Sequence, residues 1–354
     1  MVWKRIYYVD SLPQKQQLAL QRYRQKLDHV IDCIEQNESV IRLIIKDVEQ
    51  MFENVKEPAS SENNPTKSDV IASDIDKVQV TFKQLYRDWS QEGAIEREMC
   101  YKPIIDEITS IFSPDHCRTE DINILVPGAG LGRLAYEIAK RGYSCQGNEF
   151  SLFMLFASNF ILNKCHGIEI YEMYPWIQQV DNNLEIEHQA AKVKFPDINP
   201  ADLRQHTKNS KFTMVAGDFL DVYTYANEWD CVATCFFIDC ANNIMTFIEK
   251  IYKILKPGGV WINIGPLQYH FSASPEENSI EPSFEVIKDI INSVGFKIQK
   301  ERTGVPTLYS QNPKSMLKYV YESVFFVCCK PDDGSDSPTV GRVNNCSGRM
   351  TLLE

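Results

Sequence analysis

A glycine-rich stretch near the middle of the chain has the composition of a ligand-binding turn. Residues 124–126 are apolar, residues 128–132 read Gly-Ala-Gly-Leu-Gly, and residues 133–141 have the apolar spacing of a helix. Glycine permits positive φ values and lets the backbone approach a ligand closely, and the first turn of a helix offers free N–H groups. The stretch therefore predicts a strand, a turn and a helix that together hold a ligand against the backbone.

Two acidic residues follow at positions where later strands end. Glu149 lies 21 residues beyond Gly128, where a carboxylate can accept hydrogen bonds from ribose hydroxyls. Asp218 and Phe219 follow a strand predicted over residues 212–216. Each acidic residue also has an ordinary structural interpretation: Glu149 as an exposed residue at a strand end, and Asp218 as the cap of a turn.

The spacing separates two classes of cofactor-binding protein. The dinucleotide-binding fingerprint requires a small residue at position 133, where this chain has arginine. The spacing instead resembles the first motif of class I methyltransferases, which bind S-adenosyl-L-methionine. That resemblance implies that Gly128, Gly130 and Glu149 contact the cofactor, with Asp218 at its adenine amino group and Phe219 at the adenine ring. The turn at residues 255–260, Leu-Lys-Pro-Gly-Gly-Val, is also typical of this fold.

Strands and helices alternate along this part of the chain. Five strands are predicted over residues 122–126, 144–147, 212–216, 231–237 and 260–264, and four helices over residues 133–141, 152–163, 243–255 and 284–294. This order predicts an α/β, Rossmann-like fold with a mostly parallel, seven-stranded sheet covered on both faces. Strands at residues 297–300 and 319–329 predict an antiparallel terminal hairpin, which distinguishes the methyltransferase sheet from the dehydrogenase sheet.

Three further regions complete the predicted organisation. Residues 1–70 are expected to form a helical region, with a hairpin over residues 14–57 and a polar linker after it. The methyltransferase domain is predicted over residues 71–331. Its insertion at residues 165–211 is longer than an ordinary loop and is expected to cover or shape the substrate site. Residues 332–354 are expected to be disordered.

Composition limits the partners and the location. The net charge of −11 argues against broad nucleic-acid binding. Eleven cysteines without regular spacing, with neither a signal peptide nor an apolar run long enough to span a membrane, predict a soluble cytoplasmic protein, with the nucleus as a second location. Cys231, Cys235 and Cys240 lack metal-ligand spacing, so no metal site is expected.

Several segments resemble one particular family, the carnosine N-methyltransferases. The resemblance lies in residues 83–90, 126–134, 146–149, 153–155, 174–177, 236–239 and 261–267, of which the first segment lies outside the generic methyltransferase fold. It implies an enzyme that transfers a methyl group from S-adenosyl-L-methionine to a small imidazole dipeptide.

The resemblance also implies roles for individual residues. Gln84 and Arg87, one helical turn apart, would bind the methionine end of the cofactor. Asp239, His270 and Tyr321 would be the catalytic and substrate-binding residues, and Asp239 would also contact the cofactor. A carboxylate suits that role because it can accept the N–H of an imidazole ring and stabilise the positive charge that develops there.

Alternatives remain open at this point. Arg87 could form a surface ion pair with Asp88 or Glu92, while His270 and Tyr321 could be ordinary packing residues. The acceptor could be a histidine of a protein or peptide, and a non-catalytic scaffold is a third hypothesis. Finally, the N-terminal helical region has more apolar surface than a lone hairpin can bury, which suggests a homodimer.

Overall fold

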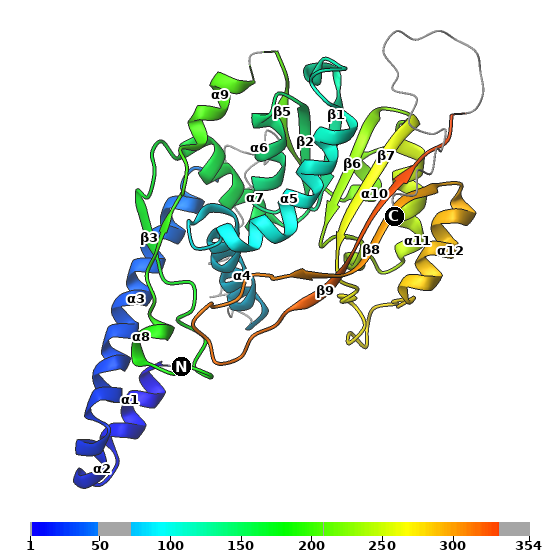
Figure 1. Cartoon of the computed structure of the whole chain (residues 1–354). Helices are drawn as coiled ribbons and strands as arrows, with labels where there is room; N and C mark the ends of the chain where they lie inside the picture. Colours follow the sequence, from blue (N-terminus) through cyan, green and yellow to red (C-terminus); the bar gives the residue numbers. More distant parts are fainter. Residues whose placement is uncertain (1, 49–71, 208, 333–354) are drawn as a thin grey trace, which may run out of the picture. The chain divides into compact units, whose positions relative to one another are not determined.

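A seven-stranded sheet forms the centre of the larger part of the protein (Figure 1). The computed structural model describes residues 2–48, 72–207 and 209–332. The strand order is β5-β2-β1-β6-β7-β9-β8. The strands are β1 (Asn123–Pro127), β2 (Ser144–Glu149), β5 (Phe212–Ala216), β6 (Trp229–Cys235), β7 (Leu255–Gly265), β8 (Lys297–Thr307) and β9 (Tyr321–Cys329).

The direction of the strands confirms the predicted fold class. Strands β5, β2, β1, β6 and β7 are parallel to one another, while β9 pairs antiparallel with both β7 and β8. Figure 1 shows the terminal pair, coloured orange to red, beside β7. The chain therefore has the Rossmann-like methyltransferase sheet, with an antiparallel hairpin at one edge.

An apolar core between the sheet and two helices explains why these segments fold as they do. Helix α11 (Ile244–Ile254) buries Ile244, Ile248 and Ile251 completely, at the spacing of one helical face. Helix α12 (Phe284–Val294) adds Ile287 and Ile291. These side chains share one cluster with side chains of four strands, Leu125, Val232, Trp261 and Phe326.

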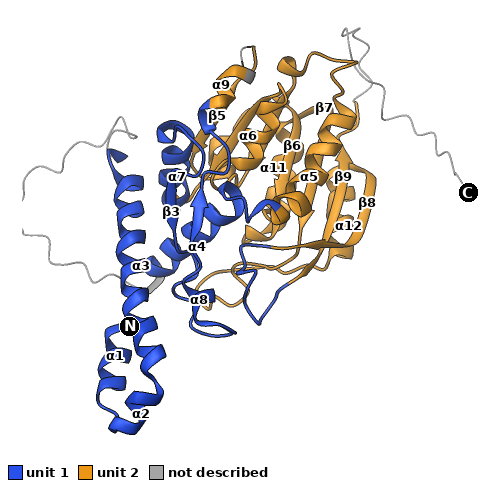
Figure 2. Cartoon of the chain, turned by 60° about the vertical axis from the view of Figure 1, so that its left-hand side comes forward, with its two compact units in different colours: residues 1–94, 152–201, 309–319 blue, residues 95–151, 202–308, 320–354 orange. Residues whose placement is uncertain are grey.

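Contacts within the chain divide it into two units, coloured separately in Figure 2. Unit 2 comprises residues 95–151, 202–308 and 320–354 and contains the seven-stranded sheet. Besides α11 and α12, its helices are α5 (Ala94–Ile111), η2 (Thr119–Asp121), α6 (Arg133–Lys140), α9 (Leu203–His206), α10 (Phe219–Val222) and η5 (Ile238–Cys240).

Unit 1 comprises residues 1–94, 152–201 and 309–319. Its elements are α1 (Val2–Asp10), α2 (Gln14–Ala19), α3 (Gln21–Ile45), α4 (Ala72–Trp89), α7 (Leu152–Asn159), the π-helix η3 (Phe160–Lys164), β3 (Tyr171–Met173), α8 (Ile186–Gln189) and β4 (Val193–Phe195), with η4 (Pro200–Asp202) at its boundary. Strands β3 and β4 form a separate antiparallel pair. Helix α3 packs against α1, β3 and α7.

One buried polar residue fixes α3 in unit 1. Asn37 lies on the same buried stripe as Val30, Cys33 and Val40. Its side-chain amide donates to the carbonyl of Tyr174 at 2.9 Å and accepts the Tyr174 N–H at 2.8 Å. Because both polar atoms are paired with backbone, the buried amide specifies the register of α3 against the segment that follows β3.

The structure differs from the sequence prediction in several element boundaries. Helix α3 contacts both α1 and α2, so the N-terminal helical region begins at Val2 rather than at residue 14, and α3 ends at Ile45; residues 49–57 of the predicted hairpin lie outside the described residues. Strand β6 ends at Cys235, before Phe236, because Phe236 has a positive φ of 52°. Strand β8 continues to Thr307 through two irregularities in its pairing with β9. Most of the predicted linker and of the C-terminal tail lies outside the described residues.

Within residues 2–48, 72–207 and 209–332, no helix combines the length and the apolar character needed to cross a membrane.

Candidate active site

The predicted site residues of unit 2 follow strand ends at one edge of the sheet. Strands β1, β2, β5, β6 and β7 are parallel, so their carboxyl ends lie at the same edge. Strand β9 runs in the opposite direction and begins at this edge, since Val324 pairs with Gly265 at the end of β7. Ligands of open α/β sheets bind at the carboxyl ends of the strands. The topology therefore places the turn after β1, Glu149, Asp218, Asp239 and Tyr321 at one edge.

The turn between β1 and α6 has the backbone conformation that its glycines predict. Gly128 and Gly130 have φ values of 63° and 56°. A methyl group on Gly128 would lie 2.5 Å from the Phe237 ring, whereas a methyl group on Gly130 would meet nothing within 4 Å. Gly128 is therefore required by packing, and Gly130 leaves open space beside the backbone.

Glu149 organises the backbone around this turn. One carboxylate oxygen, Oε2, accepts the N–H of Gly130 at 2.8 Å. The other, Oε1, accepts the N–H groups of Phe150 at 2.9 Å and Ser151 at 2.8 Å. A carboxylate offers about four lone-pair positions. The three backbone donors thus leave Glu149 able to accept one hydroxyl group of a ligand without rearrangement.

Asp218 and Phe219 have structural roles in addition to those predicted. Asp218 caps α10, because its Oδ1 accepts the Leu220 N–H at 2.7 Å. Phe219 is 4% exposed and contacts the rings of Phe237 and Phe247 at centroid distances of 5.5 Å each. The structural interpretation of Asp218 as a cap is therefore correct. Its side chain is exposed, and it directly precedes Phe219 in the chain.

Asp239 is a buried carboxylate in η5, directly after the end of β6. Its exposed fraction is 2%, and its Oδ2 accepts the backbone N–H of Gln268 at 2.8 Å. Burial raises the pKa of Asp239 above its usual range, and the Gln268 N–H and the nearby His270 oppose that rise. Asp239 therefore combines a buried position with a carboxylate whose described hydrogen-bond partners are backbone N–H groups rather than a cationic side chain.

His270 and Tyr321 lie near Asp239. The His270 N–H donates to the Asp239 carbonyl at 3.1 Å, and the His270 Nε2 lies 3.6 Å from the Cys240 Sγ. The Tyr321 hydroxyl donates to the side-chain Oε1 of Gln268 at 2.9 Å. The structure thus brings together all three residues that the family resemblance singled out for substrate binding.

Two residues that sequence reasoning missed support this arrangement. Phe236 has φ of 52°, a strained conformation for a bulky residue, and its ring contacts the Tyr321 ring edge-on at 5.8 Å. Gln268 contacts both Asp239 and Tyr321. Neither residue type predicts a site from sequence, because both roles depend on contacts with Tyr321, which is distant in the chain.

The glycine turn and the Asp239 segment are neighbours. Phe237 lies against Gly128, and Asp239 follows two residues later. Burial, followed by the charges of Asp239 and Glu149, raises the pKa of the Cys240 thiol. That thiol is therefore neutral at physiological pH, and the carboxylate of Glu149 acts electrostatically on the same segment.

Gln84 and Arg87 form a separate group within unit 1. Both side chains are 5% exposed, and both contact Tyr309. The Gln84 Nε2 donates to the Tyr309 hydroxyl, and the Arg87 guanidinium carbon lies 4.7 Å from the centroid of the Tyr309 ring. Arg87 Nη1 also lies 3.6 Å from Asp88 Oδ1, in a buried ion pair rather than the surface pair considered from sequence. Tyr309 is a further residue that sequence reasoning missed.

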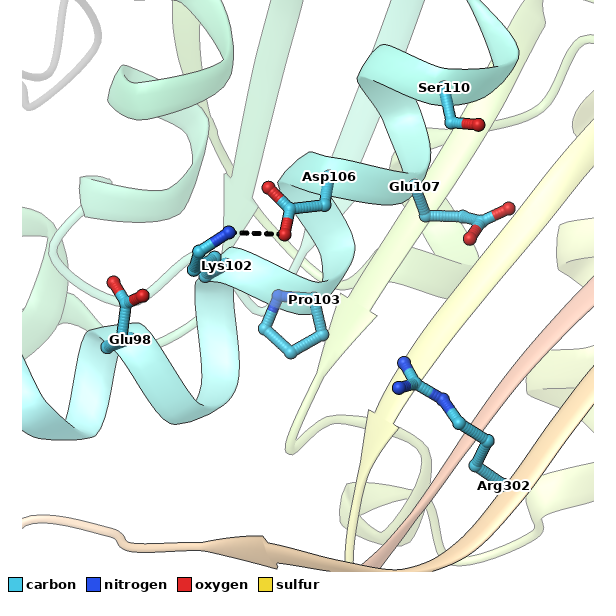
Figure 3. A pocket seen from close by; sticks show the side chains of 7 residues that line it. All are labelled: Glu98, Lys102, Pro103, Asp106, Glu107, Ser110 and Arg302. Carbon is cyan, nitrogen blue, oxygen red and sulfur yellow. Dashed lines mark hydrogen bonds and ion pairs between the residues drawn. The ribbon is translucent and has the colours of Figure 1, made fainter.

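A surface cleft elsewhere on unit 2 contains none of the predicted site residues (Figure 3). Its volume is about 410 Å³, and it is lined by Glu98, Lys102, Pro103, Asp106, Glu107, Ser110 and Arg302. Lys102 pairs with Asp106 across one turn of α5, and Glu107 pairs with Lys300. These ion pairs belong to the surface, and the cleft is not a candidate active site.

The described part of the chain contains no group of three or more His, Cys, Asp or Glu residues arranged to hold a metal ion.

Replacing Asp239 with asparagine should stabilise the protein at neutral pH. The pKa of Asp239 is raised in the folded protein, so its contribution to stability is fully present below the unfolded pKa and is lost as pH rises through the folded pKa. We expect the Tm of Asp239→Asn to exceed the wild-type value by about 2 °C or more at pH 7, with little difference near pH 3.5.

Thermal unfolding between pH 3.5 and 7.5 measures this difference. Asp289→Asn, which removes an exposed carboxylate on α12, is the matched control. A lower Tm for Asp239→Asn at pH 7 would show that its charge stabilises the fold, contrary to the prediction.

Substitutions in the glycine turn should separate ligand binding from folding. Gly130→Ala places a methyl group in the open space where we expect S-adenosyl-L-methionine, so binding should weaken by about tenfold or more. It also adds about 1 kcal/mol of backbone strain, which should lower Tm slightly. Gly128→Ala adds a clash with Phe237 and should lower Tm further. Gly304→Ala is the matched control, because Gly304 has φ of 66° and equally open surroundings.

Titration calorimetry and thermal unfolding of the three variants provide the measurement. Wild-type affinity for S-adenosyl-L-methionine in Gly130→Ala would contradict the assignment of this turn to the cofactor.

Comparison with known proteins identifies the family. A family model described as carnosine N-methyltransferase matches residues 64–332. The carnosine N-methyltransferase unmet of Drosophila melanogaster is 49% identical over 342 residues, covering 92% of this chain and 74% of that protein. The Mus musculus carnosine N-methyltransferase is 47% identical over 323 residues, covering 91% and 79%. The Schizosaccharomyces pombe carnosine N-methyltransferase is 37% identical over 314 residues, covering 85% and 82%.

Similarity to solved structures is much weaker. The putative methyltransferase in complex with the Haloferax volcanii Trm112 activator has a TM-score of 0.45 and 12% identity, covering 75% of this chain and 99% of that chain. A similarity of this size carries no information on cofactor or substrate. The family model and the sequence identities to these relatives both span most of the chain. They show that this chain belongs to the carnosine N-methyltransferase family.

Proposed function

We propose that this chain transfers a methyl group from S-adenosyl-L-methionine to an imidazole nitrogen of carnosine, giving anserine, or of a related histidine-containing dipeptide. The observation that carries the proposal is the group formed by the buried Asp239 carboxylate, His270 and Tyr321 beside the glycine turn. Membership of the family supports carnosine as the acceptor.

The residues at the sheet edge fit the proposed cofactor. The space beside Gly130 is open, the first turn of α6 offers backbone donors, and Glu149 can accept a ribose hydroxyl. Asp218 and Phe219 would contact the adenine. The bound cofactor supplies an electrophilic methyl group on a sulfonium sulfur.

Asp239 has the properties that the acceptor requires. The attacking ring nitrogen must be unprotonated, so the other nitrogen carries the proton. The Asp239 carboxylate would accept this N–H, hold the ring in the reactive tautomer and stabilise the positive charge that develops on it. The raised pKa of Asp239 also makes it a stronger proton acceptor than an exposed aspartate. His270 and Tyr321 would contact the rest of the dipeptide.

The proposal predicts methylation of carnosine that depends on Asp239. Carnosine incubated with enzyme and S-adenosyl-L-methionine should gain one methyl group, measured by mass spectrometry. Asp239→Asn should lower kcat/KM by about 100-fold or more, because an amide cannot provide the negative charge in the transition state. A Tm at or above the wild-type value provides the control that the variant is folded.

Comparator substrates make the result decisive. If cofactor binds and carnosine is inert while a histidine-containing peptide is methylated, the acceptor assignment is wrong and the chain is a peptide or protein histidine methyltransferase. If neither is methylated, the proposed activity is wrong.

The N-terminal helices support a second proposal, that the chain forms a homodimer. On α1, Trp3, Tyr7 and Tyr8 are 59%, 71% and 68% exposed, and Leu18 on α2 is 66% exposed. Such aromatic side chains are typical of interface cores. Light scattering should give twice the monomer mass, and Trp3→Glu combined with Tyr7→Glu should give the monomer mass. A monomeric wild-type protein at micromolar concentration would contradict the proposal.

A further inference from the structure

Gln268 occupies a position between the three residues of the proposed substrate site. It lies in the loop after β7, two residues before His270. Its backbone N–H donates to Asp239 Oδ2 at 2.8 Å, and its side-chain Oε1 accepts the Tyr321 hydroxyl at 2.9 Å. One residue therefore contacts two members of the site through different atoms, from a loop that also carries the third.

We propose that Gln268 is a positioning residue for the acceptor, which orients the Tyr321 phenol through its side chain and the Asp239 carboxylate through its backbone. This inference rests on the proposed function, because it concerns how the same site holds its substrate.

The direction of the Tyr321 hydrogen bond limits what the substrate can present to it. A phenol has a single proton, and Tyr321 donates that proton to Gln268. The remaining lone pairs of the phenol oxygen can only accept hydrogen bonds. A substrate group that donates a hydrogen bond, such as an ammonium or an amide N–H, can therefore meet Tyr321 without breaking its bond to Gln268, whereas a carboxylate would compete with Gln268 for the phenol proton.

The edge-on contact with Phe236 strengthens this orientation. The Phe236 ring meets the Tyr321 ring at an interplanar angle of 81° and a centroid distance of 5.8 Å. Packing therefore fixes the plane of the phenol, and the side chain of Gln268 fixes the direction of its hydroxyl proton.

The two contacts of Gln268 can be separated by substitution. Any residue at position 268 other than proline keeps the N–H that binds Asp239, whereas only some keep an acceptor for Tyr321. Gln268→Leu should therefore raise KM for carnosine by about fivefold, which is the loss of binding expected when one ordinary hydrogen bond is removed. The value of kcat should change less than about twofold. Gln268→Glu retains an oxygen acceptor and should retain the KM to within about twofold.

A double-mutant cycle tests whether the two side chains act together. Tyr321→Phe should raise KM by at least as much as Gln268→Leu, and the double variant should show no loss beyond Tyr321→Phe. The matched control is Gln146→Leu, which also removes a Tyr-to-Gln hydrogen bond, from Tyr223 at 2.9 Å, in the sheet rather than in the site. It should leave KM unchanged.

Additive effects of Gln268→Leu and Tyr321→Phe, an unchanged KM in Gln268→Leu, or an equal defect in Gln268→Leu and Gln268→Glu would each overturn the proposal. A second readout does not depend on carnosine being the acceptor. With 3-fluorotyrosine incorporated at position 321, the ¹⁹F resonance should shift in Gln268→Leu and not in Gln146→Leu. An unmoved resonance overturns the role of Gln268, whereas a moved resonance with inert carnosine refutes only the proposed acceptor.

Discussion

The close contact between Gly128 and the Phe237 ring ties the cofactor turn to the segment that carries Asp239. A methyl group at position 128 would lie 2.5 Å from that ring, so a side chain of any size would force the two segments apart. The Phe237 ring is held in place by its neighbours. Its centroid lies 4.8 Å from that of the stacked Phe247 ring and 5.5 Å from that of the Phe219 ring. The distance between the two functional loops is therefore set by the aromatic core beneath them.

The same region contains features that oppose stability. Phe236 has a positive φ, and Asp239 is a buried carboxylate, and both lie within five residues of the end of β6. Residues of the adjoining strands β7 and β9, including Ile262, Ile264 and Phe326, are each 0% exposed. The densely packed strands β6, β7 and β9 thus provide the rigidity that keeps a strained residue and a buried charge in place.

The sequence predicted the features that are encoded locally. The alternation of strands and helices, the antiparallel hairpin and the positive-φ glycine turn all depend on short-range apolar periodicity and on glycine chemistry. Residues whose roles arise from tertiary contacts were missed. Tyr309 meets Gln84 across 225 residues of sequence, and Gln268 meets Tyr321 across 53. The N-terminal helical pair was placed too late in the sequence, because α1 carries only Ile6 and Val9 as buried residues among exposed aromatic side chains.

Unit 1 consists of three separate stretches of chain, and the last of them, residues 309–319, follows two of the three stretches of unit 2. Residues 312, 315 and 316 are held there by contacts with residues 188, 179 and 182. During synthesis, the first two stretches of unit 1 must wait until residue 319 has left the ribosome before these contacts can form. Truncation anywhere upstream of this point removes part of both units. The Tyr309 contacts to Gln84 and Arg87 can therefore form only late in synthesis, after most of the chain has been made.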